Sequence, residues 1–128
     1  DQGSGDVDSR HNYFYPLHLR PGARTVALSE YGGIAWPMPG HEPPRKTYGY
    51  GTAKTRAELT ERYQKLQRGT VLPQLKNGLS ALVYTQVSDV EDEVNGLFTY
   101  DRAAIKPEPA VVRAVNEALE KAFEEAVK

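Results

Sequence analysis

Two short, nearly continuous apolar runs constrain the fold of this chain more than any other feature. Residues 25–29 (TVALS) and residues 79–85 (LSALVYT) are each bounded by glycine or proline. Runs of this length and composition are typical of strands that are buried on both faces of a parallel sheet. A weaker candidate lies in residues 6–15, where a strand over about residues 6–9 would end in an aromatic loop. We therefore expect three parallel strands.

Two helices follow from local patterns. Thr55 and Glu58 form a capping box, and Leu59, Tyr63 and Leu66 recur at helical spacing, which predicts a helix over about residues 57–68. The second helix begins near two prolines, which suit a first turn, and one of its faces is apolar. Its apolar positions are Val112, Val115, Leu119, Phe123 and Val127.

The order of strands and helices predicts an α/β fold with parallel pairing. A chain of 128 residues has about the length of one domain. Three strands and two helices are too few to close a barrel or to cover both faces of a sheet. We therefore expect residues 1–128 to be part of a domain from a longer, multidomain protein, and a first residue other than Met agrees with a processed or cut chain.

Composition excludes several classes of function. The formal net charge of −1 lacks the basic excess of nucleic-acid-binding proteins, and the absence of cysteine excludes disulfide scaffolds, thiolate catalysis and iron–sulfur clusters. No run approaches the ~18 apolar residues of a membrane span, and the first residues do not form a signal peptide. We expect neither nucleic acid nor membrane as a partner, and the compartment stays open.

The ends of the predicted strands hold the candidate reactive groups. Glu30 ends the run TVALS just before two glycines, the place where α/β barrels carry catalytic groups, although a solvated or capping carboxylate is the commoner outcome. His11 and Tyr13 follow the first strand and Tyr84 ends the third. A polar loop with a packed tyrosine is the alternative at both places.

A metal site is not expected. The acidic segment 88–102 suggests calcium, but its glycine does not stand at the sixth position of an EF-hand loop, so solvated or arginine-paired carboxylates are the better interpretation. The three histidines lack close metal-ligand spacing. We expect no cofactor.

An aromatic-rich segment over residues 31–52 is longer than an ordinary connection. Trp36, Tyr31, Tyr48 and Tyr50 lie in it or flank it. Beside a strand-end carboxylate, such side chains suit the C–H faces of sugar rings, whereas simple packing of the loop onto a helix is equally compatible.

Three motifs resemble a known family. They are LSEYGG (residues 28–33), GHEPPRKTYGYGT (residues 40–52) and YTQVSDVEDEVNGLFTYDR (residues 84–102), and the third is the most specific. They are similar to the carboxyl-terminal part of the catalytic barrel of glycoside hydrolase family 2, which contains β-galactosidases, β-glucuronidases and β-mannosidases. The resemblance covers nearly the whole chain. It implies that the chain forms about the last three βα units, with strands 6 to 8, of a (β/α)₈ TIM barrel.

The resemblance also implies roles for individual residues. Glu30 matches the catalytic nucleophile, Tyr13 the tyrosine that hydrogen-bonds it, and His11 a polar loop position. Tyr84 matches an aromatic position that is tryptophan in the best-known relatives, and Trp36 would help to shape the sugar subsite. The family's acid/base glutamate follows an asparagine, and the Asn116–Glu117 pair lies outside that motif.

The expected function is that of a retaining β-glycoside hydrolase in carbohydrate metabolism, with this chain supplying the nucleophile half of the site. Such enzymes need two carboxyl groups about 5 to 5.5 Å apart, so the chain by itself is expected to be inactive. The alternative is a non-catalytic carbohydrate-binding or assembly module derived from the barrel. The expected partners are a carbohydrate and, because two sheet edges would be open, either a second copy in a homodimer or the rest of the barrel.

Overall fold

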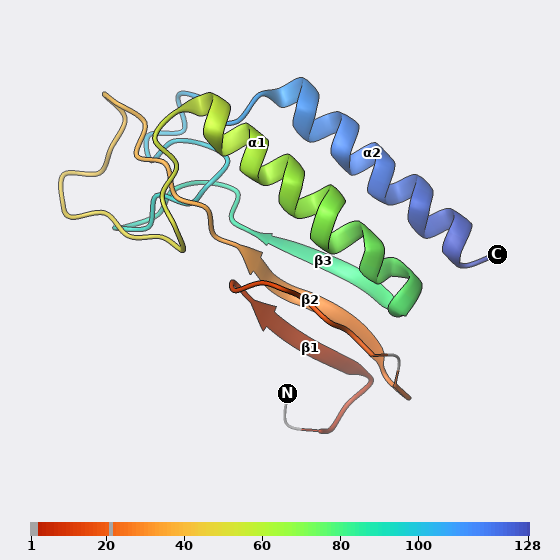
Figure 1. Cartoon of the computed structure of the whole chain (residues 1–128). Helices are drawn as coiled ribbons and strands as arrows, with labels where there is room; N and C mark the ends of the chain where they lie inside the picture. The colour runs from red at the N-terminus through yellow and green to blue at the C-terminus, as the bar shows by residue number, and fades with distance from the viewer. Residues whose placement is uncertain (1–2, 21) are drawn as a thin grey trace.

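The computed structural model describes residues 3–20 and 22–128. In chain order the elements are strand β1 (Val7–Asn12), strand β2 (Thr25–Gly32), helix α1 (Arg56–Leu66), strand β3 (Leu79–Thr85) and helix α2 (Pro109–Ala126). A π-helical segment, η1 (Gln67–Val71), and a 3₁₀ segment, η2 (Leu72–Asn77), continue α1 towards β3. Strands and helices lie close to the positions predicted from the sequence (Figure 1).

The three strands form one sheet in the order β1-β2-β3, and both pairs are parallel. β2 is the central strand, and its residues Val26 and Leu28 are almost fully buried. The register between β1 and β2 shifts between Arg10 and His11, which sets His11 opposite Glu30. All three strands therefore end at the same edge of the sheet, and their last residues converge there.

Helix α1 begins as the capping box predicts. The side chain of Thr55 accepts a hydrogen bond from the backbone N–H of Glu58 at 3.1 Å, which satisfies a donor that the first turn leaves free. Leu59, Tyr63 and Leu66 are buried against the sheet. The helical segments end at Gly78, whose φ of 85° is the left-handed conformation that glycine adopts at low cost.

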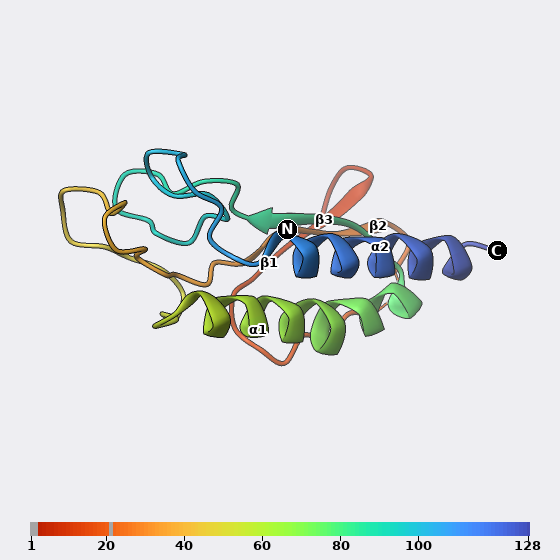
Figure 2. The same ribbon diagram turned by 90° about the horizontal axis from the view of Figure 1, so that it is seen from above.

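Helix α2 packs beside α1, and both run along the sheet (Figure 1 and Figure 2). Val115 and Leu119 join the hydrophobic core. The predicted apolar stripe extends further than the core does, since Phe123 is 39% and Val127 66% exposed. α2 is therefore anchored through its middle turns.

The two faces of the sheet differ. The core lies between the sheet and the helices and includes Leu28, Leu59, Leu79 and Val115. On the other side Val83 is 56% exposed, and the hydroxyls of Ser9 and Ser29 form a hydrogen bond of 2.6 Å. Among the described residues, the helices cover one face only.

The prediction that the chain is the last three βα units of a TIM barrel is wrong. The structure is a small domain with an open three-stranded parallel sheet and two helices. Three βα units require a helix after each strand, whereas the described residues between β1 and β2 contain none. Buried apolar runs that alternate with amphipathic helices are common to every parallel α/β fold, so the pattern itself does not distinguish a barrel from a small open sheet.

Two long loops lie beyond the carboxyl ends of the strands, over residues 33–55 and 86–107. They are joined through their backbones: the N–H of Trp36 donates to the carbonyl of Val94 at 2.9 Å, and Tyr48 pairs with Glu93 in an isolated bridge. These contacts fix the loops around the ends of the strands.

Among the described helices, none has the length and apolar character that crossing a membrane requires.

Candidate functional site

A carboxylate lies where the three strands end. Glu30, near the end of β2, accepts a hydrogen bond of 2.9 Å from the hydroxyl of Tyr13, which follows β1 directly. The same hydroxyl lies 3.2 Å from Oγ1 of Thr85, the last residue of β3. Each strand thus contributes one polar group to a single cluster, as parallel strands that end at one edge allow.

His11 is the second polar group beside Glu30. Its Nδ1 lies 3.3 Å from Oε2 of Glu30, the oxygen that also accepts the bond from Tyr13. The side chains of His11 and Glu30 are 57% and 46% exposed. The carboxylate is therefore oriented by neighbours but still open to solvent, which a nucleophile that must reach a substrate requires.

Tyr13 is suited to donate rather than to ionise. Burial is the main cause that raises its pKa to about 12, and the contact with Glu30 adds to the shift while Thr85 opposes it. The phenol therefore keeps its proton at neutral pH. A protonated phenol donates to Glu30 and holds one carboxylate oxygen in place.

Aromatic rings extend the site. Tyr13 stacks on Tyr50 with ring centroids 3.8 Å apart and planes 8° from parallel. Phe14 approaches Tyr50 edge-on, with 6.2 Å between centroids, and is 77% exposed. Gly33 makes this packing feasible, because a Cβ there would lie 2.6 Å from the ring of Tyr50. The glycine after the strand end thus serves close packing of the aromatic pair.

A hollow of about 520 Å³ opens beside Glu30. Its walls include Ser29, Thr85, Gln86 and Arg102. Arg102 was not singled out from the sequence, because it lies in a loop far along the chain and only the folded loop brings it near β2. The one signal was its place in the long motif that ends at residue 102.

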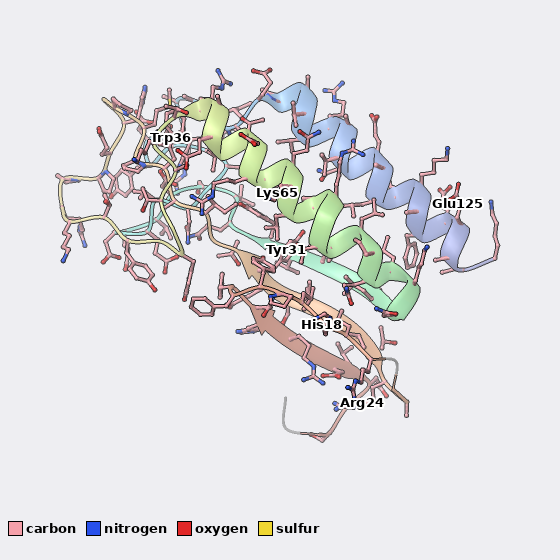
Figure 3. All side chains as sticks on the ribbon, in the orientation of Figure 1. His18, Arg24, Tyr31, Trp36, Lys65 and Glu125 are labelled. Carbon is pink, nitrogen blue, oxygen red and sulfur yellow. The ribbon has the colours of Figure 1, made fainter. Side chains whose placement is uncertain are left out.

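The other predicted substrate-binding residues lie in different surroundings. Trp36 is only 8% exposed and belongs to the hydrophobic core, among the loops beyond the strand ends (Figure 3). Tyr84 borders the hollow but packs edge-on against Tyr31 and Tyr63, and burial raises its pKa well above the ordinary range. The structure thus brings His11, Tyr13 and Glu30 together, adds Tyr84 at the wall, and places Trp36 in the core.

The acidic segment holds structural carboxylates. Oδ1 of Asp89 lies 2.8 Å from Nζ of Lys106, which also donates to the carbonyl of Val94 at 2.8 Å, and the Lys106 side chain is fully buried. Burial raises the pKa of Asp89 and lowers that of Lys106, and the contact between them opposes both shifts. The sequence predicted solvated or arginine-paired carboxylates here, whereas Asp89 pairs with a buried lysine.

Asp101, at the end of the same segment, pairs with the other long loop. Its carboxylate lies 2.7 Å from Nδ1 of His41 and accepts hydrogen bonds from Thr99 and Ala103.

Among the described residues, no group of three or more metal-ligating side chains comes together. Asn116, the residue before Glu117, accepts a hydrogen bond from Tyr63 at 3.2 Å and belongs to the contact between α1 and α2.

Comparison with known proteins assigns no family to this chain. No family model matches the chain, and no curated protein matches it. The functional interpretation therefore rests on the motifs in the sequence and on the geometry around Glu30.

Proposed function

We propose that this chain supplies the nucleophile half of the active site of a retaining β-glycoside hydrolase. The supporting observation is the convergence on Glu30: a half-exposed carboxylate at the strand ends, 2.9 Å from a tyrosine hydroxyl and 3.3 Å from an imidazole nitrogen. The resemblance to glycoside hydrolase family 2 assigns the nucleophile and its tyrosine to these same two residues, Glu30 and Tyr13.

In this mechanism a carboxylate oxygen of Glu30 attacks the anomeric carbon and displaces the aglycone oxygen with its bonding electrons. Tyr13 holds the carboxylate in position by donating a hydrogen bond to its Oε2. Water then attacks the anomeric carbon of the glycosyl ester, the C–O bond to Glu30 breaks, and the sugar leaves with retained configuration. Protonation of an ordinary leaving group, and removal of a proton from the attacking water, need a second carboxyl group, to which the resemblance matches no residue of this chain.

The test uses a reagent that reacts with the nucleophile without help from an acid group. A 2,4-dinitrophenyl 2-deoxy-2-fluoro-β-glycoside carries a leaving group that departs without protonation, so the nucleophile can act without its acid partner. The chain is incubated with the galactoside, glucoside, mannoside and glucuronide versions of this reagent. We expect a mass increase of one fluoroglycosyl group, located on Glu30 by peptide mapping, with at least one of them.

Glu30→Gln is the matched control, because it keeps the size and hydrogen-bonding capacity of the side chain and removes its nucleophilic charge. It should remain unlabelled. Modification of a different residue, or failure of all four reagents with the wild-type chain, would refute the assignment of Glu30.

The second candidate is a non-catalytic carbohydrate-binding module. The exposed Phe14 ring beside the Tyr13–Tyr50 stack favours it, because aromatic surfaces bind the C–H faces of sugars without any chemistry. Under this alternative, sugars would shift the NMR signals of the aromatic rings equally in wild-type and Glu30→Gln chains, and no label would form.

A further inference from the structure

A second hollow, distinct from the one that opens beside Glu30, is lined by the Tyr13 ring. It has a volume of about 370 Å³ and is bounded by the aromatic side chains that follow β1 and by one side of α1. Tyr13 and Tyr50 form one wall, and Arg62 and Lys65 come from α1. Its lining is completed by Tyr15, Gly32, Ile34, Leu66 and Thr70.

The charge of this hollow is positive. Arg62 and Lys65 are three residues apart on α1, so they point to the same side of the helix. Arg62 faces Glu58 at 3.8 Å, but both side chains are more than a third exposed, and such a surface pair contributes little. Among the described residues, no carboxylate lies within salt-bridge distance of Lys65. An incoming anion can therefore engage both cations.

The tyrosines of the hollow do not oppose an anion. Burial is the main cause that raises the pKa of Tyr15 to about 12, as it does for Tyr13, so both phenols stay neutral. Tyr13 donates its hydrogen bond to Glu30, and Tyr15 can donate a hydrogen bond to an anion. Gly51 in the long aromatic loop leaves room for Arg62, because a Cβ on Gly51 would lie 2.8 Å from its guanidinium.

We infer that this hollow binds an anionic substituent of a sugar, either a carboxylate or an ester sulfate. The aromatic wall suits the ring, and the two cations on α1 suit the oxyanion. The sugar part of the ligand rests on the proposed function, because Tyr13 is shared between the hollow and the Glu30 site. The oxyanion part rests on Arg62 and Lys65 alone.

The experiment is an NMR titration of the chain with four probes: inorganic sulfate, methyl β-glucoside, methyl β-glucuronide and methyl β-glucoside 6-sulfate. We expect sulfate and at least one charged glycoside to shift the signals of Arg62, Lys65 and Tyr15, and the neutral glucoside to bind more weakly. The carboxylate and the sulfate ester distinguish the two sources of the oxyanion. Equal affinity for neutral and charged glycosides would overturn the inference.

Two variants and a matched control sharpen the result. Lys65→Gln and Arg62→Gln should each weaken binding of the charged glycoside about tenfold or more, because hydrogen bonds to charged groups are the strong ones. Lys76→Gln, which removes an exposed lysine from η2, should leave the affinity unchanged. If Lys65→Gln and Lys76→Gln had the same effect, a specific site would be excluded.

Failure of the proposed function can be separated from failure of this inference. Glu30→Gln abolishes glycosyl labelling but leaves Arg62 and Lys65 in place, so it should bind inorganic sulfate as the wild type does. A chain that binds sulfate but is never labelled refutes the glycosidase proposal alone. A chain that is labelled on Glu30 but does not discriminate charged from neutral glycosides refutes the oxyanion site alone.

Discussion

Two carboxylates near the carboxyl ends of the strands lie in opposite surroundings. Asp89 is almost completely buried and contacts the ammonium group of Lys106 at 2.8 Å. Glu30 is 46% exposed, and its closest partners are a neutral phenol and an exposed imidazole. The first carboxylate has its full charge matched inside the protein, whereas the second keeps a face open to solvent.

The two environments suit the two carboxylates to different roles, one in stability and one in reactivity. A charge that is buried and matched stabilises a loop but cannot reach a substrate, and the Asp89–Lys106 pair joins the start of the 86–107 loop to its end. An exposed carboxylate that is only oriented contributes little to stability and remains reactive. The predictions below test this division, from the largest expected effect to the smallest.

The largest effect should come from Lys106→Met. The substitution leaves Asp89 buried without its counter-charge, and breaking a buried pair in this way costs about 3–5 kcal/mol of unfolding free energy. Urea denaturation measures the loss. The matched change, Glu30→Gln, should alter stability by less than about 1 kcal/mol, as surface substitutions do.

Replacing Asp89 as well provides the control. Lys106→Met combined with Asp89→Asn removes both charges and should recover part of the lost stability. A Lys106→Met chain as stable as the Glu30→Gln chain would show that the two carboxylates are not in different environments.

Tyr13→Phe should weaken the chemistry at Glu30 while the fold persists. The substitution removes the 2.9 Å hydrogen bond to the carboxylate, and bonds to charged groups are worth about 1.5–3 kcal/mol, so glycosyl labelling should slow about 10- to 100-fold. Rates of mass increase for wild-type and variant chains give the ratio. An unchanged rate would contradict a positioning role for Tyr13.

Alkaline pH should weaken the Tyr13 contact. The pKa of Tyr13 is raised from 10.0 to about 12, so the folded state holds the phenolic proton more tightly than the unfolded state does. Its contribution to stability is therefore complete below pH 10 and declines as the pH rises from 10 to 12. The difference in unfolding free energy between wild type and Tyr13→Phe should shrink over that window, and a difference that grew instead would contradict the assignment.

The smallest effect on stability should come from the contacts of Asp101. Hydrogen bonds from Thr99 and Ala103, together with His41, hold the pKa of this exposed carboxyl well below its usual value of 3.8. A lowered pKa means that the contribution is complete above pH 3.8 and is lost as the pH falls further. The unfolding free energies of wild type and Asp101→Asn, measured as the pH is lowered, should converge below about pH 4. A constant difference between them down to pH 2 would exclude a contribution from this contact.

The sequence predicted local structure well because its signals are local. The capping box at Thr55 and the apolar run before Gly33 each specify a backbone conformation within a few residues. The assignment to part of a barrel was wrong because buried apolar runs that alternate with amphipathic helices are common to parallel α/β folds, and no single strand or helix encodes how many strands a sheet contains.

The site was only partly predictable for a similar reason. Glu30 and Tyr13 stand at strand ends, where parallel pairing brings side chains together, so their meeting could be expected. Trp36 was expected at the sugar subsite but lies in the core. Burial of a large indole is favourable, and its position in a loop did not show that it would be buried. Arg62 and Lys65 were not singled out from the sequence, and only the folded position of the aromatic loop makes them walls of a hollow.

The most direct test of the account compares the two carboxylates in one sample. The chain is treated with the activated 2-fluoro glycoside, digested, and the peptides that contain Glu30 and Asp89 are quantified by mass spectrometry. The account predicts a glycosyl ester on the Glu30 peptide, an unmodified Asp89 peptide, and no ester on either in the Glu30→Gln chain. A label on Asp89, or labelling that persists in Glu30→Gln, would contradict it.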